Sequence, residues 1–298
     1  MDSSLRRGSL EMVAAMLISG TIGWFVLVSG QPVLEVVFWR CVFGAVTLLV
    51  ICAAFGFLRA GVISRTAFLL AIASGVAIVG NWLLLFASYS RASIAIGTAV
   101  YNVQPFMLVG LAALFLGEKI TLAKLTWLSV AFLGMLAIVS AHGAGQGGGE
   151  EYLLGIALAL GAAFLYAIAA LIIKRLKGTP PHLIALIQVT TGVLVLAPWV
   201  KLGGLPGEVP ALASLLTLGI VHTGLMYVLL YSAIQRLPTA LTGALSFIYP
   251  IAAILVDWVA FGHPLAPLQW LGVGLILLAA AGMQQGWWFR PARLAVKN

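Results

Sequence analysis

The sequence contains very little charge. Asp, Glu, Lys and Arg make up only 8% of its 298 residues, and eight of these residues are acidic. A soluble domain carries roughly 25% charged residues. Hydrophobic residues make up 62% of the chain, and its mean hydropathy is +1.13. A chain of this composition cannot cover a water-exposed surface with charge, so it is not a soluble globular protein and a lipid bilayer is its expected solvent.

Cysteine, histidine and catalytic motifs are also scarce. The two cysteines, Cys41 and Cys52, fall on one expected helix. Their separation of about 16 Å along that helix is too long for a disulfide, so we interpret them as packing residues. The four histidines are scattered, and neither HExxH nor GxSxG occurs. An intramembrane enzyme needs a nucleophile with its base or a metal cluster. We therefore expect no enzymatic activity, no cofactor and no metal.

Long apolar runs fill most of the chain. A membrane-spanning helix needs about 20 apolar residues, and ten such runs are separated by turns rich in Gly and Pro. The predicted spans are 10–30, 34–57, 66–88, 92–115, 122–141, 152–173, 182–200, 209–232, 239–260 and 265–286. The predicted fold class is therefore an all-α integral membrane protein with ten transmembrane helices.

The basic residues indicate the orientation of these helices. With the N-terminus inside, thirteen of the sixteen Lys and Arg residues fall on the cytoplasmic side, Arg91 and Lys201 fall outside, and Arg40 lies within a span. This bias follows the positive-inside rule and predicts that both termini are cytoplasmic. It also explains the net charge of +8 without a nucleic acid as partner. The expected partners are the bilayer and a small-molecule substrate.

A repeat of 145 residues divides the chain into two halves. The repeat superposes Arg91 on Arg236, Pro105 on Pro250 and Gly117 on Gly262. The Gly-rich segment 143–151 is the expected link, with one five-helix repeat at 1–143 and a second at 144–298. Because five is an odd number of spans, the second repeat enters the membrane upside down. Many secondary transporters have this layout, with the substrate site between the repeats near the midplane.

Polar and aromatic side chains near the middle of the spans are candidates for that site. Some lie beside the repeated prolines, and others are isolated within apolar runs. The candidate cavity residues are Trp24, Asn81, Trp82, Tyr101, Asn102, Gln104, Tyr166, Gln188, His222, Ser246 and Tyr249. Such groups can bind a substrate through hydrogen bonds and aromatic stacking. They can equally serve helix packing and interhelical hydrogen bonding, so both interpretations stay open.

Four further residues carry structural expectations. Pro105 and Pro250 are expected to be hinges, because proline removes a backbone donor and loosens the preceding turn, although a static kink is the alternative. Arg40 is expected to be a structural anchor near the outer surface, either snorkelling or paired with Glu35. Glu118 is expected to cap the helix that follows it, with gating as the less favoured alternative.

Two motifs give the chain a family resemblance. The phrase VVFWRCVFGAV in the second predicted helix and the pattern P-x11-GEKIT at the end of the fourth, together with the repeated ten-span layout, resemble the EamA type of the drug/metabolite transporter superfamily. One departure is His263-Pro264 in the second repeat, where the first has Glu118-Lys119. The resemblance covers nearly the whole chain, and within the superfamily it is to bacterial amino-acid exporters of the YddG kind.

This resemblance implies a multi-pass protein of the bacterial inner membrane that moves small organic metabolites by alternating access. Exported amino acids, aromatic ones included, are the expected substrates, because neutral polar and aromatic groups near the midplane suit a zwitterion. A multidrug or other-metabolite carrier is the alternative. Nucleotide-sugar carriers are disfavoured, since no lysine is central and Arg40 is expected to be peripheral. A channel would need a filter or charged rings, which the sequence does not show.

Overall fold

The computed structural model describes residues 3–59, 61–140, 150–200, 205–261 and 266–287, and every regular element within these ranges is a helix. The first six are α1 (Ser3–Ser19), α2 (Ile22–Ser29), α3 (Val33–Ala54), α4 (Arg65–Tyr101), α5 (Gln104–Leu116) and α6 (Leu122–Ser140). The remainder are α7 (Glu150–Arg175), α8 (Pro181–Leu196), α9 (Val209–Gly219), the π-helix η1 (Ile220–Leu225), α10 (Met226–Arg236), α11 (Thr239–Ser246), α12 (Ile248–Phe261) and α13 (Pro267–Gln285). Most of the predicted link, Gly262 and His263-Pro264 lie outside the described residues.

The predicted spans all correspond to apolar helical stretches. Five stretches are long and apolar enough to cross a membrane, and they are Ser3–Ser29, Val33–Ala54, Arg65–Tyr89, Glu150–Arg175 and Val209–Arg236. Five shorter apolar helices cover the other spans. Large apolar side chains remain on the outside of the bundle, with Val259 80% exposed and Leu114 75% exposed. Such a surface is suited to lipid rather than water.

α4 contains the boundary between the third and fourth predicted spans. The chain is helical as far as Tyr101, so the expected break at 88–92 is not a gap between two helices. The chain still turns back within α4, because a Cβ added to Gly97 would lie 2.7 Å from Ser88 Oγ and 2.9 Å from the ring of Tyr89. Nine residues of a straight helix would span about 13 Å. The helical interruption comes later, at Asn102 and Val103.

The repeated prolines both lie shortly after an interruption. Pro105 is the second residue of α5, and Pro250 is the third residue of α12. A proline is tolerated in the first turn of a helix, because the N–H groups there have no intrahelical acceptor. The preceding interruptions begin at Asn102 and at Phe247, which are 145 residues apart. The hinge role of the two prolines stays a prediction.

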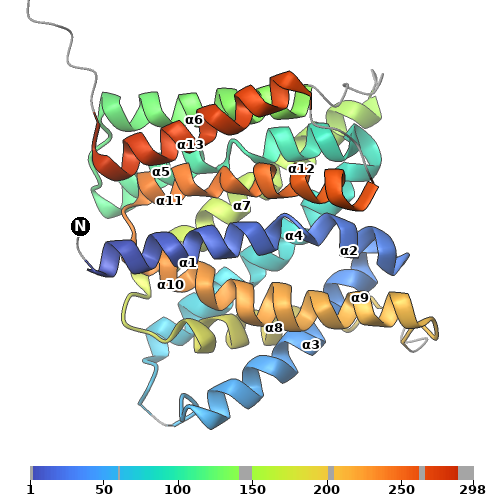
Figure 1. Ribbon diagram of the computed structural model, residues 1–298. Helices are drawn as coiled ribbons and strands as arrows, with labels where there is room; N and C mark the ends of the chain where they lie inside the picture. Colours follow the sequence, from blue (N-terminus) through green and yellow to red (C-terminus); the bar gives the residue numbers. More distant parts are fainter. Residues whose placement is uncertain (1–2, 60, 141–149, 201–204, 262–265, 288–298) are drawn as a thin grey trace, which may run out of the picture.

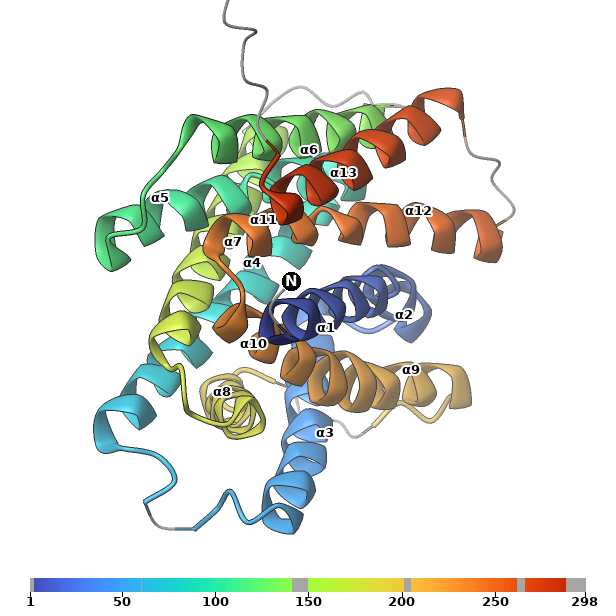
Figure 2. The same cartoon turned by 60° about the vertical axis from the view of Figure 1, so that its left-hand side comes forward.

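The helices form a layered bundle (Figure 1). α6 and α13 pack together along one edge in both views, and α3 lies at the opposite edge, where it packs against α8 (Figure 2). Between these edges α1 packs against α10, and α4 packs against α7. A shift of 145 residues maps one contact onto another. It maps the contact of α1 with α10 onto that of α7 with α4, and the contact of α3 with α9 onto that of α8 with α4.

Glycines allow two close helix crossings. A Cβ added to Gly219 of α9 would lie 2.3 Å from Phe43 Cβ of α3, and one added to Gly75 of α4 would lie 2.9 Å from Gln188 Cα of α8. Phe43 and Gln188 are 145 residues apart. Small residues let helix backbones approach closely in membranes, so the same type of crossing is used in both halves.

Candidate functional site

A cavity of about 560 Å³ lies between the two halves of the chain. Its walls come from α1 to α5 on one side and from α7, α10, α11 and α12 on the other. Asn102, at the first helix interruption, lines it, and so do Ser246 and Tyr249 on either side of the second. Interrupted helices are tolerated at membrane depth where they are buried in protein or line a cavity.

Nine of the eleven candidate residues line this cavity. They are Trp24, Asn81, Trp82, Tyr101, Asn102, Gln104, Tyr166, Ser246 and Tyr249. The rings of Tyr101 and Tyr166 meet edge to face with centroids 6.1 Å apart. Asn81 Nδ2 donates to the carbonyl of Ala162 at 2.8 Å, which ties α4 to α7. The structure thus brings these residues together, and their contact with a substrate stays a prediction.

Arg40 belongs to the cavity, contrary to its expected peripheral position. It is 1% exposed, so it does not snorkel, and it forms no ion pair with Glu35 or any other carboxylate of the described residues. Its Nε donates to Thr223 Oγ1 at 2.8 Å and its Nη2 to the carbonyl of His222 at 3.3 Å. The expectation was wrong because a helix that is apolar all round does not reveal which face points inward.

Tyr227 is a cavity residue that was not predicted. Trp82 Nε1 donates to its hydroxyl at 2.8 Å, and the two rings meet edge to face with centroids 5.5 Å apart. Positions 82 and 227 differ by 145, the length of the repeat. Applying the 145-residue shift to Trp82 was therefore the signal that could have found Tyr227.

Gln104 presents an unused acceptor at the cavity. Its Nε2 donates to Ser246 Oγ at 3.3 Å, which connects the two interrupted regions. Its Oε1 is buried and has no hydrogen-bond partner among the described residues. A buried polar atom left without a partner costs about 1–3 kcal/mol. This oxygen can therefore accept a hydrogen bond from a molecule in the cavity.

The two other candidates lie outside the cavity, although they were predicted to line it. Gln188 on α8 donates to the hydroxyl of Ser74 and accepts from the hydroxyl of Tyr231. His222 on η1 has its Nε2 2.6 Å from Thr21 Oγ1 and its Nδ1 3.2 Å from a backbone carbonyl. Both residues instead form buried hydrogen bonds between helices, which was the alternative to lining the cavity. Polarity within an apolar run does not distinguish the two roles.

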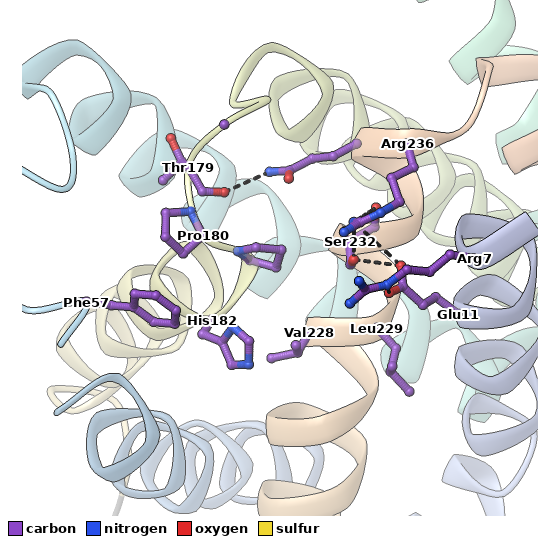
Figure 3. Close-up of a pocket in the computed structure, with 13 residues that line it drawn as sticks. Arg7, Glu11, Phe57, Thr179, Pro180, His182, Val228, Leu229, Ser232 and Arg236 are labelled. Carbon is purple, nitrogen blue, oxygen red and sulfur yellow. Dashed lines mark hydrogen bonds and ion pairs between the residues drawn. The ribbon is translucent and has the colours of Figure 1, made fainter. Parts of the chain in front are cut away.

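A second cavity of about 480 Å³ lies near the ends of α1, α8 and α10 (Figure 3). There Glu11 accepts hydrogen bonds from Arg7 Nε at 2.9 Å and from Ser232 Oγ at 2.6 Å, and it lies 3.7 Å from Arg236 Nη1. The side chain of Glu11 is 12% exposed. These contacts, which we call the Glu11 cluster, tie the N-terminal half of α1 to the C-terminal end of α10.

Glu118 connects three helices and does not cap the following one as expected. Thr239 Oγ1, at the start of α11, donates to its carboxylate at 2.5 Å. Lys174 Nζ, near the end of α7, lies 3.4 Å from the same oxygen and donates to the carbonyl of Leu237 at 2.7 Å. These residues form the Glu118 cluster. It lies at helix ends that the predicted topology assigns to the cytoplasm, as does the Glu11 cluster.

Relatives of the chain are transporters. The sequence profile of the EamA-like transporter family matches residues 6–140 and 153–284. An uncharacterized transporter of Bacillus subtilis, YxxF, is 29% identical over 91% of this chain and 88% of its own length. The threonine/homoserine exporter RhtA of Escherichia coli is 29% identical over 70% of this chain and 68% of its own. A probable terminal-alkyne amino-acid exporter of Streptantibioticus cattleyicolor is 28% identical over 63% of this chain and 64% of its own.

The fold also occurs in a solved structure. A crystal structure of a protein with 20% sequence identity superposes with a TM-score of 0.80 and covers 98% of this chain and 99% of its own. That likeness shows the fold alone. The profile matches and the curated relatives show a multi-pass membrane transporter and not an enzyme. The chain belongs to the EamA-like transporter family, within the drug/metabolite transporter superfamily.

Proposed function

We propose that this transporter exports amino acids across the bacterial inner membrane by alternating access. The substrate site is the central cavity between two inverted five-helix repeats, 1–143 and 144–298. The observation that carries the proposal is that nine predicted residues meet in one cavity beside two helix interruptions 145 residues apart. RhtA and the terminal-alkyne amino-acid exporter, whose names describe amino-acid export, support the substrate class.

Contacts exchanged by the repeat support the inverted arrangement. α1 packs against α10 as α4 packs against α7, and α3 and α8, which correspond to each other, pack together. Trp82 and Tyr227, also corresponding positions, share a hydrogen bond at the cavity wall. A pseudo-two-fold axis through this pair accounts for all of these contacts. Two halves related in this way can close over either end of the site, which is the physical basis of alternating access.

The position of the cavity supports a state that is open to the outside. Its walls run from Tyr249, in the middle of a predicted span, to Leu27, Val33 and Tyr89 near predicted outer ends. At the predicted cytoplasmic ends, the Glu11 and Glu118 clusters hold helices of the two halves together. Opening toward the cytoplasm has to separate these halves, so the two clusters form the inner gate.

Apart from Arg40, the chemistry of the walls supports a small substrate with hydrogen-bonding and apolar groups. Tyr101, Tyr166 and Tyr249 offer aromatic faces, and Gln104 and Ser246 offer hydrogen-bonding groups. A zwitterion with an apolar or short polar side chain fits this mixture. The second candidate is a multidrug or other-metabolite carrier of the same superfamily. It is favoured by the apolar part of the wall, which includes Met16, Val26, Leu85, Phe86 and Leu230.

Transport by purified protein in liposomes tests the proposal. Labelled threonine, leucine and phenylalanine should move at saturable rates, measured with and without a pH gradient. Gly23 of α2 lines the cavity and has open space around its Cβ position, so Gly23→Trp should obstruct the cavity and reduce transport at least about 10-fold. Gly110 of α5 also has open space but does not line the cavity, so Gly110→Trp is the matched control and should transport normally.

Two results would contradict the proposal. Failure to move any amino acid under either gradient would favour the drug or other-metabolite carrier. Equal transport by Gly23→Trp and the wild type would show that the substrate does not pass through this cavity.

A further inference from the structure

The central cavity contains one buried charge with no counter-ion. Arg40 is the single charged side chain among the described residues that line it, and Arg40 is 1% exposed. No carboxylate of the described residues lies within ion-pair distance of its guanidinium. Burying a cation without an anion is unfavourable, because the cation loses its hydration and gains no opposite charge in return. An anion that enters the cavity would supply the missing charge.

The neighbours of Arg40 hold it in place but do not neutralise it. Thr223 Oγ1 donates to the carbonyl of Leu218 at 2.8 Å and so accepts the hydrogen bond from Arg40 Nε at 2.8 Å. The Cζ atom lies 4.1 Å from the ring centroid of Trp82 and 5.7 Å from that of Tyr227. Aromatic faces attract a cation, but they leave its charge in place. These two hydrogen bonds and a third with the side chain of Tyr227 use fewer than the five N–H donors of the guanidinium, so donors remain for an acceptor in the cavity.

A purely structural role explains the position of Arg40 but not its charge. Its hydrogen bonds to Thr223 and His222 join α3 to η1 through one hydroxyl and one carbonyl. A neutral side chain with two amide N–H donors could make the same two bonds without burying a charge. The charge is therefore the feature that requires a further partner. Since Arg40 lines the cavity, that partner can be the transported molecule.

We propose that Arg40 binds the carboxylate of the substrate, an inference that rests on the proposed amino-acid transport and makes its chemistry specific. The planar guanidinium matches a carboxylate with two parallel hydrogen bonds. One cation balances one carboxylate, whereas a phosphate monoester carries roughly −1.5 to −2 charges and would leave negative charge buried. Gln104 Oε1, the unpartnered acceptor in the same cavity, suits an N–H or O–H donor of the same molecule. A zwitterionic amino acid has both groups.

Pairs of probes that differ only in the carboxylate test the assignment in the wild-type protein. L-Phenylalanine is compared with L-phenylalaninol, and phenylacetate with 2-phenylethanol, by thermal stabilisation of the detergent-solubilised full-length protein. Each acid should stabilise the protein at concentrations at least about 10-fold lower than its alcohol, because a hydrogen bond to a charged group contributes about that factor. Phenyl phosphate should be weaker than phenylacetate. The second pair lacks an amino group, so it tests the carboxylate site even if amino acids are not transported.

Variants locate the effect at Arg40. Arg40→Gln can keep the bonds to η1 and should abolish the difference between each acid and its alcohol. Arg40→Lys keeps the charge but not the planar fork, so it should retain part of the difference. Arg65 is exposed at the start of α4, so Arg65→Gln makes the same chemical change away from the cavity and should retain the full difference. The wild-type comparison stands even if a variant does not fold.

The outcomes separate this inference from the proposed function. Equal stabilisation by acids and alcohols in the wild type, or an undiminished difference in folded Arg40→Gln, would overturn the assignment while leaving amino-acid transport intact. Stronger stabilisation by phenyl phosphate than by phenylacetate would also overturn it. Selective stabilisation by phenylacetate, without transport of any amino acid, would uphold Arg40 as a carboxylate site and reject the amino-acid proposal.

Discussion

Replacing Gly219 with alanine should loosen the crossing of α3 and α9. The added Cβ would lie 2.3 Å from Phe43 Cβ and 3.1 Å from the backbone nitrogen of Gly44, whereas ordinary contact begins at 3.4 Å. The two helices would therefore have to separate locally by about 1 Å, since backbone and Cβ atoms cannot rotate away as a flexible side chain can. Overpacking of this kind costs about 1–3 kcal/mol, and the rigid neighbours put Gly219 at the upper end.

The net effect includes a gain in helix propensity. Alanine is favoured over glycine inside a helix by about 1 kcal/mol, so the expected net loss for Gly219→Ala is about 2 kcal/mol. With an unfolding entropy of about 2.1 cal/mol/K per residue, this loss should lower the midpoint of thermal unfolding of the 298-residue chain by about 3 °C. Circular dichroism or fluorescence-detected gel filtration of the heated, detergent-purified protein measures this shift.

Gly274 of α13 provides the matched control. A Cβ added there meets no atom within 4 Å, so Gly274→Ala should gain stability by up to about 1 kcal/mol. Gly75→Ala, at the corresponding crossing of α4 and α8, should lose less than Gly219→Ala, because its nearest atom is 2.9 Å away. If Gly219→Ala were as stable as Gly274→Ala, the close approach of α3 and α9 would be refuted.

Three further predictions concern the gate, the two-fold axis and the hinges. Glu11→Gln should weaken the inner gate by about 1.5–3 kcal/mol, so amide hydrogen exchange in the first half of α1 should become roughly 10-fold faster or more. Unchanged exchange would count against a gate there. Trp82→Phe and Tyr227→Phe should show a coupling of about 1 kcal/mol in a double-mutant cycle of stability, and additive effects would mean that their hydrogen bond contributes nothing. Replacing both Pro105 and Pro250 with alanine should slow transport, and unchanged uptake and efflux rates would reject the hinge hypothesis.

The helical content and most of the cavity residues could be predicted from the sequence, because both depend on local sequence features. Hydropathy marks each span directly, and the repeated prolines mark where the two helices are interrupted. Tyr101, Asn102 and Gln104 could be placed at the cavity because they cluster just before Pro105. The two free, buried cysteines also agree with their predicted packing role.

The inward faces of the helices could not be predicted in the same way. In lipid a helix can be apolar all round, so periodicity does not show which side meets protein. Gln188 and His222 were therefore indistinguishable from cavity residues, and Arg40 was placed at the periphery although it is buried at the cavity. The contact of Glu118 with Thr239 joins residues 121 positions apart and depends on the packing of α5 and α11. Local capping rules do not contain that information.

The π-helical turn η1 was also not predicted. Ile220–Leu225 contains no proline, and its one glycine, Gly224, does not by itself predict a π-helical turn. Such turns occur often at functional sites. Here the turn contains His222 and Thr223, whose carbonyl and hydroxyl hold Arg40 at the cavity wall. The physical reason for the turn therefore lies in a contact between α3 and η1 that sequence patterns along one helix do not record.

The most direct test of a carrier with a single central site is counterflow in liposomes. Vesicles containing the purified protein are loaded with unlabelled threonine and diluted into a trace of labelled threonine. The account predicts that label accumulates transiently inside the vesicles above its equilibrium level, because the site carries unlabelled threonine out and returns with labelled threonine. Gly23→Trp should abolish this accumulation. Label that only equilibrates, at the same rate with empty and loaded vesicles, would contradict alternating access and indicate a channel or an inactive protein.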